Sequence, residues 1–246
     1  MTRTRIYFIS DVHLGLDDSH AAEREKEDTL ITFLRAIRTD AEVLYILGDL
    51  FEFWFEYRTA VPTSGARVLF ELHALVQAGV RVVYIPGNHD IWLGPYLAEQ
   101  VGLECADGPI TVVHHGRTLH LAHGDESRTD RLFRASRAIL RSPTCIVLFR
   151  LLHPDLGALL ARLASRVSGY HAHLNPCPGL DRPLAHARHV IAQGADMILC
   201  GHYHRVLEKE VDGGTVVFLG DWLNASGTYA VLEAGALDLR KWPDDA

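Results

Sequence analysis

Cysteine is scarce in this chain of 246 residues, and its placement excludes two common stabilising devices. No two cysteines show C-x-x-C spacing, so the sequence indicates neither a zinc ribbon nor a disulfide framework. The four residues are Cys105, Cys145, Cys177 and Cys200. We therefore expect free thiols and a fold that depends on a buried core.

Long apolar runs are also missing. No run approaches the roughly 18 residues of a transmembrane helix, and no apolar stretch of a secretory signal precedes the first expected strand. Linkers rich in Pro, Gly or Ser, internal repeats and low-complexity tracts are absent as well. At this length we expect one domain over residues 1–246. We expect it to be cytoplasmic, with peripheral contact on the cytoplasmic face of the inner membrane left open.

The chain has no overall excess of basic residues. Its 24 lysines and arginines are outnumbered by 31 aspartates and glutamates, which gives a net charge of −7. This balance argues against a nucleic-acid partner, and no protein partner is predicted. The charge is unevenly spread, because eight arginines lie between Arg128 and Arg166 against two aspartates. Such a basic segment suits phosphate groups or anionic lipid headgroups.

Five short polar clusters, each after a short apolar run, carry the chemistry. The runs read as buried strands, and they are Ile6–Ile9, Val43–Leu47, Val82–Ile85, Leu119–Ala122 and Met197–Cys200. The clusters are Asp11-Val12-His13, Gly48-Asp49, Gly87-Asn88-His89-Asp90, His123-Gly124-Asp125 and Gly201-His202-Tyr203-His204. Because ligands gather outside the carboxyl ends of such strands, we expect the five clusters to converge in space.

The spacing of the clusters predicts an insertion. The first four follow one another at intervals of 38, 39 and 35 residues, each long enough for a strand, a crossover helix and a return. The last interval is 79 residues, so we expect an insert near residues 126–195. The insert is predicted to be helical because apolar residues recur at helical spacing. These residues are Leu156, Leu159, Leu160, Leu163 and Val167.

The side chains of the clusters are suited to a pair of divalent metal ions. Two aspartates, one asparagine and several histidines are available, and imidazole shifts the preference from Mg²⁺ toward Mn, Fe or Zn. We expect two ions, with Mn²⁺ favoured and Fe or Zn as alternatives. Such a pair implies hydrolysis of a phosphate ester. Adjoining glycines predict close backbone approach to the metals, and they are Gly48, Gly87, Gly124 and Gly201.

In type and order, these motifs resemble those of the calcineurin-like metallophosphoesterase superfamily, over essentially the whole chain. The resemblance implies a four-layer α/β fold, with two facing mixed β-sheets flanked by helices and a helical insert as a lid. It also implies two sets of metal ligands. One set is Asp11, His13 and His204, the other is Asn88, His123 and His202, and Asp49 bridges the two metals.

The same resemblance implies a catalytic histidine outside the ligand sets. His89 would stabilise the developing charge on phosphorus or protonate the leaving oxygen. Asp90 would orient the His89 ring, and the alternative for Asp90 is a helix N-cap. Asp125 would hydrogen-bond a ligand histidine or serve as a turn residue.

Two further stretches are similar to elements of the UDP-2,3-diacylglucosamine hydrolases of the lipid A pathway. They are Gly48-Asp49-Leu50-Phe51-Glu52-Phe53-Trp54, matching G-D-L-F-E-x-W, and Leu219-Gly220-Asp221-Trp222, matching L-G-D-W. This similarity implies cleavage of the pyrophosphate bond of UDP-2,3-diacylglucosamine, giving UMP and 2,3-diacylglucosamine 1-phosphate. An acylated UDP-sugar would then be the substrate. Ordinary packing of the aromatic residues is the alternative for both stretches.

Two departures from that family leave the substrate open. His89 stands where its best-known members carry Arg, and Thr129-Asp130-Arg131 stands where many show T-D-D. A divergent branch or a relative with another substrate would explain both. The alternative is therefore a metal-dependent phosphodiesterase or phosphoprotein phosphatase acting on a soluble substrate. In that case the apolar residues of the insert would form its own core, and otherwise they would cover acyl chains.

Two other classes are disfavoured. An interaction module on a degenerate phosphoesterase fold usually loses metal ligands, whereas all seven positions here are Asp, Asn or His. A DNA nuclease of the superfamily would need an additional cap and a large basic groove, and the sequence shows neither.

Overall fold

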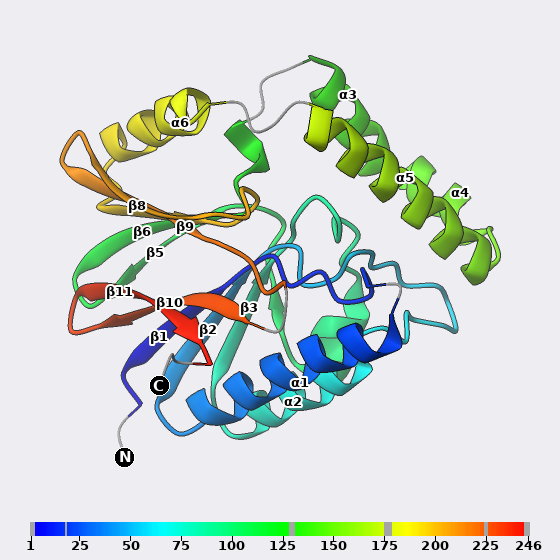
Figure 1. Ribbon diagram of the computed structural model, residues 1–246, viewed down its shortest axis with the longest axis horizontal. Helices are drawn as coiled ribbons and strands as arrows, with labels where there is room; N and C mark the ends of the chain where they lie inside the picture. The colour runs from blue at the N-terminus through cyan, green and yellow to red at the C-terminus, as the bar shows by residue number, and fades with distance from the viewer. Residues whose placement is uncertain (1–2, 18, 128–130, 175–178, 224–225, 244–246) are drawn as a thin grey trace.

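The computed structural model describes the chain except residues 1–2, 18, 128–130, 175–178, 224–225 and 244–246, and the side chains of residues 132–134 and 165–174 are also outside the description. Four layers make up the fold, and Figure 1 shows two β-sheets facing each other between helices. Helices α1 (His20–Ile37) and α2 (Ala66–Gln77) cover the outer face of the first sheet, and α6 (Asp181–Ala192) covers the second. The expected α/β fold with two mixed sheets is confirmed.

The first sheet has six strands in the order β11-β10-β1-β2-β3-β4. Strands β1 to β4 run parallel, and β10 and β11 add an antiparallel edge beside β1. Three of the predicted strands lie here. The bounds are β1 Arg5–Ile9, β2 Ala41–Leu47, β3 Arg81–Ile85, β4 Glu104–Cys105, β10 Gly227–Glu233 and β11 Ala236–Trp242.

The second sheet has five strands in the order β5-β6-β7-β9-β8. Strands β6, β7 and β9 run parallel, and β5 and β8 form antiparallel edges. The other two predicted strands, β6 and β7, lie side by side in this sheet. The bounds are β5 Ile110–His114, β6 Arg117–Ala122, β7 Met197–Cys200, β8 Val206–Val211 and β9 Gly214–Leu219.

Alternating side chains of the strands build three cores, one between the sheets and one on the outer face of each sheet. From β1, Ile6 and Phe8 point between the sheets, while Tyr7 and Ile9 pack outward against α1 and α2. Helix α1 follows the N-cap Ser19 and buries Leu30, Phe33 and Leu34 at the three- and four-residue spacing of an amphipathic helix. Since both faces of β1 are buried, the continuous apolar run of its sequence is explained.

Helices occupy most of the chain between β6 and β7. They are η2 (Asp125–Ser127), α3 (Arg131–Leu140), α4 (Pro143–Arg150), α5 (Pro154–Leu174) and α6. In Figure 1, α3, α4 and α5 stand away from the layers, whereas α6 packs on the second sheet. That residues 126–195 form a single insert stays a prediction. By its packing on the second sheet, α6 belongs to the outer layer of the fold.

Two chain-wide features accompany this fold. Within the described part of the chain, no helix has the length and apolar character needed to cross a membrane. Cys105, Cys145 and Cys200 are free thiols, and Cys177 lies outside the described residues.

Candidate metal centre

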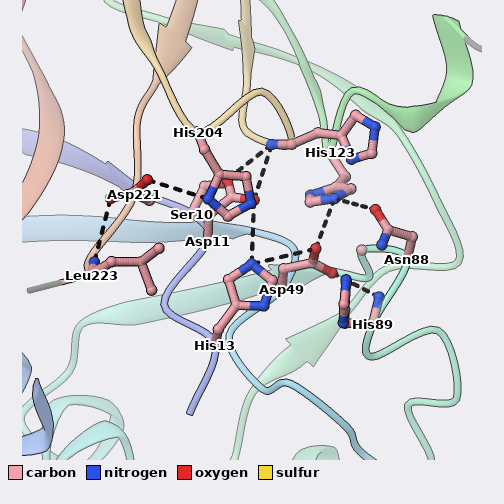
Figure 2. Close-up of polar contacts among 12 residues, drawn as sticks. Ser10, Asp11, His13, Asp49, Asn88, His89, His123, His204, Asp221 and Leu223 are labelled. Carbon is pink, nitrogen blue, oxygen red and sulfur yellow. Dashed lines mark hydrogen bonds and ion pairs between the residues drawn. The ribbon is translucent and has the colours of Figure 1, made fainter. Parts of the chain in front are cut away.

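The five polar clusters meet at one end of the two sheets. The loops after β1, β2 and β3 come from the first sheet and those after β6 and β7 from the second, and their side chains point toward one another in Figure 2. Three overlapping groups of His and Asp side chains hold their ligand atoms within 4.8 Å of one another. These groups are Asp11, His13 and His204; Asp11, Asp49 and His123; and His13, Asp49 and His89.

An unusual backbone marks this end of the molecule. Eight described residues other than glycine have a positive φ, a conformation that non-glycine residues rarely adopt. Three of them, His115, Asp212 and Ala234, each precede a glycine in a hairpin turn. The other five are predicted metal ligands, namely Asp11, His13, Asp49, His202 and His204. Strained conformations of this kind concentrate at functional sites.

His123 and Asn88 define one side of the centre. The Nδ1 of His123 lies 2.9 Å from the carbonyl oxygen of Leu47. Because that oxygen can only accept, Nδ1 carries the proton in the neutral ring and Nε2 presents a lone pair. Around this Nε2 lie two oxygens, Oδ1 of Asn88 at 3.0 Å and Oδ2 of Asp49 at 3.2 Å. Three potential ligand atoms thus face one point.

His13 and His204 show the same arrangement on the other side. Nδ1 of His13 lies 2.8 Å from Oε2 of Glu52, and Nδ1 of His204 lies 3.2 Å from Oδ2 of Asp221. In both rings the remaining Nε2 faces Oδ1 of Asp11, at 3.9 Å for His13 and 3.6 Å for His204. In metal-binding histidines, one ring nitrogen typically donates to an acceptor, and the other ring nitrogen then faces the metal.

Asp49 lies between the two sides. Its Oδ2 is 3.2 Å from Nε2 of His123 and 3.8 Å from Nε2 of His13, while Oδ1 accepts the backbone N–H of His89 at 2.8 Å. Although burial opposes ionisation, the neighbouring His123 holds the pKa of Asp49 well below its usual range. The carboxylate is therefore charged and placed for a bridging ligand.

The residues present fit two divalent cations. Nε2 of His13 is buried and has no hydrogen-bond partner among the described residues, although its surroundings are polar. Such a buried orphan nitrogen is costly unless something binds it. Asp11 and Asp49 are both fully buried and close together, and they would repel each other without cations. A pair of divalent cations would bind the lone pair of His13 Nε2 and would also offset the negative charge of the two carboxylates.

His202 takes part through its backbone as well as its ring. Its N–H donates to both carboxylate oxygens of Asp11, at 3.1 and 2.9 Å. The centroid of its ring lies 5.1 Å from that of His123. The structure therefore brings all seven predicted ligand residues together, and their assignment to individual metals stays a prediction.

His89 lies beside the ligand groups with a carboxylate partner. Its Nδ1 is 3.3 Å from both Oε1 and the carbonyl oxygen of Glu52. Burial lowers the pKa of His89, but Glu52 and the charge of Asp49 outweigh it and raise the value to about 9. Bound cations would oppose this rise, because like charges disfavour the protonated ring. The geometry leaves Nε2 available to a substrate.

The expected role of Asp90 is corrected. Its carboxylate does not contact the His89 ring but accepts the backbone N–H groups of Gly87, Asp49 and Phe51, together with the hydroxyl of Tyr84. No helix begins directly after it, so the N-cap alternative does not apply either. Asp90 joins the loop after β2 to the loop after β3, and both loops carry predicted metal ligands.

Two residues that the sequence did not single out as site residues contact histidines of the candidate centre. Glu52 contacts both His13 and His89, and Asp221 contacts His204. Glu52 lies in the stretch G-D-L-F-E-x-W, and Asp221 lies in L-G-D-W. The motifs therefore included both residues but did not indicate their roles. Within these stretches Phe51, Trp54 and Trp222 are buried core residues, as the packing alternative expected.

Two of the adjoining glycines are required by close approach. A Cβ on Gly87 would overlap the carboxylate of Asp49, and a Cβ on Gly201 would overlap the side chains of Ser10 and Asp11. Any side chain at these positions would therefore displace a predicted ligand. Gly48 adds a third tight approach, to the ring of His123.

Two helices of the insert contact residues that lie close in sequence to the predicted site residues. Arg137 of α3 forms an ion pair with the buried Asp125, at 2.6 Å, two residues after His123. Phe149 of α4 packs on Phe55 and Trp92, with ring centroids 4.7 and 4.8 Å apart. Arg131, which stands where the T-D-D pattern has its second Asp, is exposed and begins α3, whereas Thr129 and Asp130 lie outside the described residues.

A cavity of about 530 Å³ separates the insert from the loop after β2. At one end it reaches Glu52, the partner of His13 and His89. Its lining is mostly apolar: Leu14, Phe53, Val61, Pro62, Ala158 and Leu159 contribute to it, with Asp155 and Arg162 of α5 as charged members. The cavity therefore lies between α5 and Glu52, which contacts two histidines of the candidate centre.

The chain is similar in sequence to known proteins over most of its length. The family model described as calcineurin-like phosphoesterase matches residues 4–206. A UDP-2,3-diacylglucosamine hydrolase of Porphyromonas gingivalis is 33% identical over 261 aligned residues, covering 98% of this chain and 99% of that protein. The enzyme of the same name from Neisseria meningitidis serogroup B is 34% identical, covering 89% and 90%. A solved archaeal phosphodiesterase is 15% identical with a TM-score of 0.48, covering 97% and 98%.

Proposed function

This chain belongs to the calcineurin-like phosphoesterase family, and we propose that it hydrolyses the pyrophosphate bond of UDP-2,3-diacylglucosamine. The coarser activity, that of a metal-dependent phosphoesterase, follows from the family and the His/Asp groups. The observation that carries the finer proposal is the largely apolar cavity beside the metal centre, which offers a place for acyl chains. Relatives named for this hydrolysis match nearly the whole chain.

In this proposal the seven ligand residues hold two divalent ions. Asp11, His13 and His204 hold one, and Asn88, His123 and His202 hold the other, with Asp49 between them. Bound divalent ions, with Mn²⁺ favoured by the mixed nitrogen and oxygen donors, stabilise phosphate charge and activate water. Glu52 and Asp221 fix the rings of His13 and His204 so that Nε2 faces the centre.

His89 acts on the substrate rather than on the metals. Attack of water on the α-phosphorus forms a new P–O bond and breaks the bond to the bridging oxygen, which leaves with the sugar phosphate. Glu52 holds the His89 ring by Nδ1, so Nε2 can stabilise the developing charge or give a proton to the leaving oxygen. The products are UMP and 2,3-diacylglucosamine 1-phosphate.

The insert supports an acylated substrate because four leucines of α5 keep much of their apolar surface exposed. Leu156, Leu159, Leu160 and Leu163 of α5 are each between 43% and 52% exposed. Leu159 lines the cavity, whereas the other three do not. Val167, which shares the predicted spacing, and Arg166 have side chains outside the described residues.

A direct assay tests the proposal. Purified protein with Mn²⁺ is offered UDP-2,3-diacylglucosamine and, separately, a soluble aryl phosphodiester, and UMP release is followed for the first. Preferred turnover of the acylated substrate supports the proposal. Turnover of the aryl ester alone supports the alternative, a phosphodiesterase or phosphatase for a soluble substrate, which the His89 departure favours.

Leu159 should set the preference for the acylated substrate. Removing its apolar contact by Leu159→Ser is expected to lower kcat/KM for UDP-2,3-diacylglucosamine about tenfold, because each methylene of an acyl chain gains about 0.8 kcal/mol on burial. The aryl phosphodiester should be cleaved at the normal rate. Leu160→Ser is the matched control, since Leu160 is similarly exposed but outside the cavity lining. Equal losses on both substrates would contradict the acyl-binding role.

We further propose that the insert gives the protein a peripheral contact with an anionic membrane surface. On α4 and directly after it, Val147, Leu148 and Leu151 are 54%, 60% and 78% exposed, and Arg150 lies among them. Exposed apolar side chains with arginine suit an interface of acyl chains and anionic headgroups. Arg128 and the side chains of Arg134 and Arg166 lie outside the described residues.

Vesicle sedimentation tests this contact. The double variant Leu148→Ser/Leu151→Ser should reduce binding to phosphatidylglycerol vesicles by at least about tenfold, since two apolar side chains no longer leave water. Phe70→Ser on α2 is the control, because Phe70 is 74% exposed on a different face of the fold. If the wild-type protein does not sediment with the vesicles, the membrane contact is wrong.

A further inference from the structure

Lys26 on α1 is a buried lysine that the chemistry described above does not use. Its side chain is only 3% exposed. Lysine is almost never fully buried unless it is paired, because burying an unpaired ammonium group is very costly. The position therefore requires a specific set of partners.

All three donors of the Lys26 ammonium group have an acceptor within reach. Nζ donates to the carbonyl oxygen of His13 at 2.8 Å and to Oδ2 of Asp17 at 2.9 Å, and lies 3.2 Å from Oε2 of Glu23. Glu23 in turn accepts the backbone N–H of Gly15 at 2.7 Å and that of Asp17 at 3.3 Å. Two side chains of α1 thus hold the loop that follows His13.

The loop needs such support because of its backbone. His13 has a φ of +52°, a conformation that costs energy in a residue with a side chain. On its N-terminal side, the N–H of His13 is tied to the carbonyl oxygen of Asp49 at 3.0 Å. On its C-terminal side, the His13 carbonyl meets Lys26. Lys26 itself is carried by a helix whose Leu30 and Phe33 are fully buried against the first sheet.

We propose that Lys26 is a positioning residue for the metal ligand His13. By fixing the carbonyl of His13 to the rigid helix α1, it holds the strained backbone that aims Nε2 of His13 at Asp11 and Asp49. Of the predicted ligand residues, all of which the structure describes, Lys26 contacts only His13, and it would act on the centre through that residue and the loop that follows it. The inference rests on the proposed metal centre and is independent of the identity of the substrate.

Mn²⁺ binding tests this role without any substrate. Metal-free protein is titrated with Mn²⁺, and free Mn²⁺ is followed by electron paramagnetic resonance, which gives the stoichiometry and both affinities. Lys26→Met should weaken one of the two binding events by about 10- to 100-fold, the range for residues that orient a ligand. The variant is expected to fold, because Met has similar length and Asp17 stays 36% exposed to water.

The control is a variant on the neighbouring helix α2, at a residue that pairs with α1 away from the loop that follows His13. Arg67→Met removes the ion pairs of Arg67 with Glu27 and Asp28, and should leave both Mn²⁺ affinities unchanged. Wild-type affinities in Lys26→Met, or equal weakening in Arg67→Met, would overturn the proposal. If Lys26→Met does not accumulate as folded protein, Lys26→Gln is measured in the same way with the same expectation. The two proposals can fail separately. If Lys26→Met weakens Mn²⁺ binding as expected but the wild-type protein does not hydrolyse UDP-2,3-diacylglucosamine, only the proposed substrate is overturned.

Discussion

Replacing Asp49 with alanine is expected to abolish hydrolysis and to lower bound metal from two ions toward one or none. Oδ2 of Asp49 lies between His13 and His123, so its loss removes a ligand from both proposed sets. It also removes the acceptor for the backbone N–H of His89. Metal content after gel filtration and UMP release measure the two effects. Retention of two metals with normal turnover would refute the proposed centre.

A second variant separates charge from shape at this position. Asp49→Asn keeps the size of the side chain and one oxygen that can accept the His89 N–H, but it removes the charge. A bridging role requires that charge, so Asn should restore little of the metal content or activity. If Asn restores both, Asp49 serves mainly to hold the loop of His89. Thermal melting in chelator checks that both variants are folded.

The sequence predicted the convergence of the five polar clusters well because their signals are local and repeated. Each cluster follows an apolar run bounded by turn residues, and β1, β2, β3, β6 and β7 all form where these runs lie. Parallel strands place their carboxyl ends on the same edge of a sheet, so distant clusters meet. The confirmed part of the prediction therefore rests on strand pattern and on the family resemblance together.

The intervals were a weaker guide to the path of the chain. The first two contain the crossover helices α1 and α2, as expected. The third, between Asn88 and His123, has nearly the same length but contains the π-helical turn η1 (Leu97–Val101), the edge strand β4 and the hairpin of β5 and β6. It carries the chain from one sheet to the other. Length alone cannot distinguish a crossover helix from a change of sheet.

Roles that depend on long-range contacts could not be predicted. Asp90 was assigned to its sequence neighbour His89, but two of its partners are backbone N–H groups on the loop after β2, about 40 residues earlier in the sequence. Glu52 takes the place that Asp90 was given, because the loop after β2 brings it beside the His89 ring. Lys26 shows the same limit, since a lysine on an amphipathic helix gives no sign in the sequence that it is buried.

His89→Ala is expected to slow turnover by about 10²- to 10⁴-fold, the range for a lost general acid or a lost charge-stabilising group. The smaller loss is favoured because a sugar phosphate is a better leaving group than an alkoxide. Metal content should remain at two ions, since His89 is outside both proposed ligand sets. A marked drop in metal content would instead make His89 a ligand, which its closeness to His13 and Asp49 would allow.

His89→Arg then separates the two roles left open for this residue. Arginine, which the best-known diacylglucosamine hydrolases carry at this position, stabilises negative charge but does not give up a proton at neutral pH. If His89 stabilises charge, the Arg variant should recover most of the activity that His89→Ala loses on UDP-2,3-diacylglucosamine. If His89 protonates the leaving oxygen, the Arg variant should stay near the Ala variant. Glu52 can pair with either side chain, so the comparison keeps the positioning carboxylate constant.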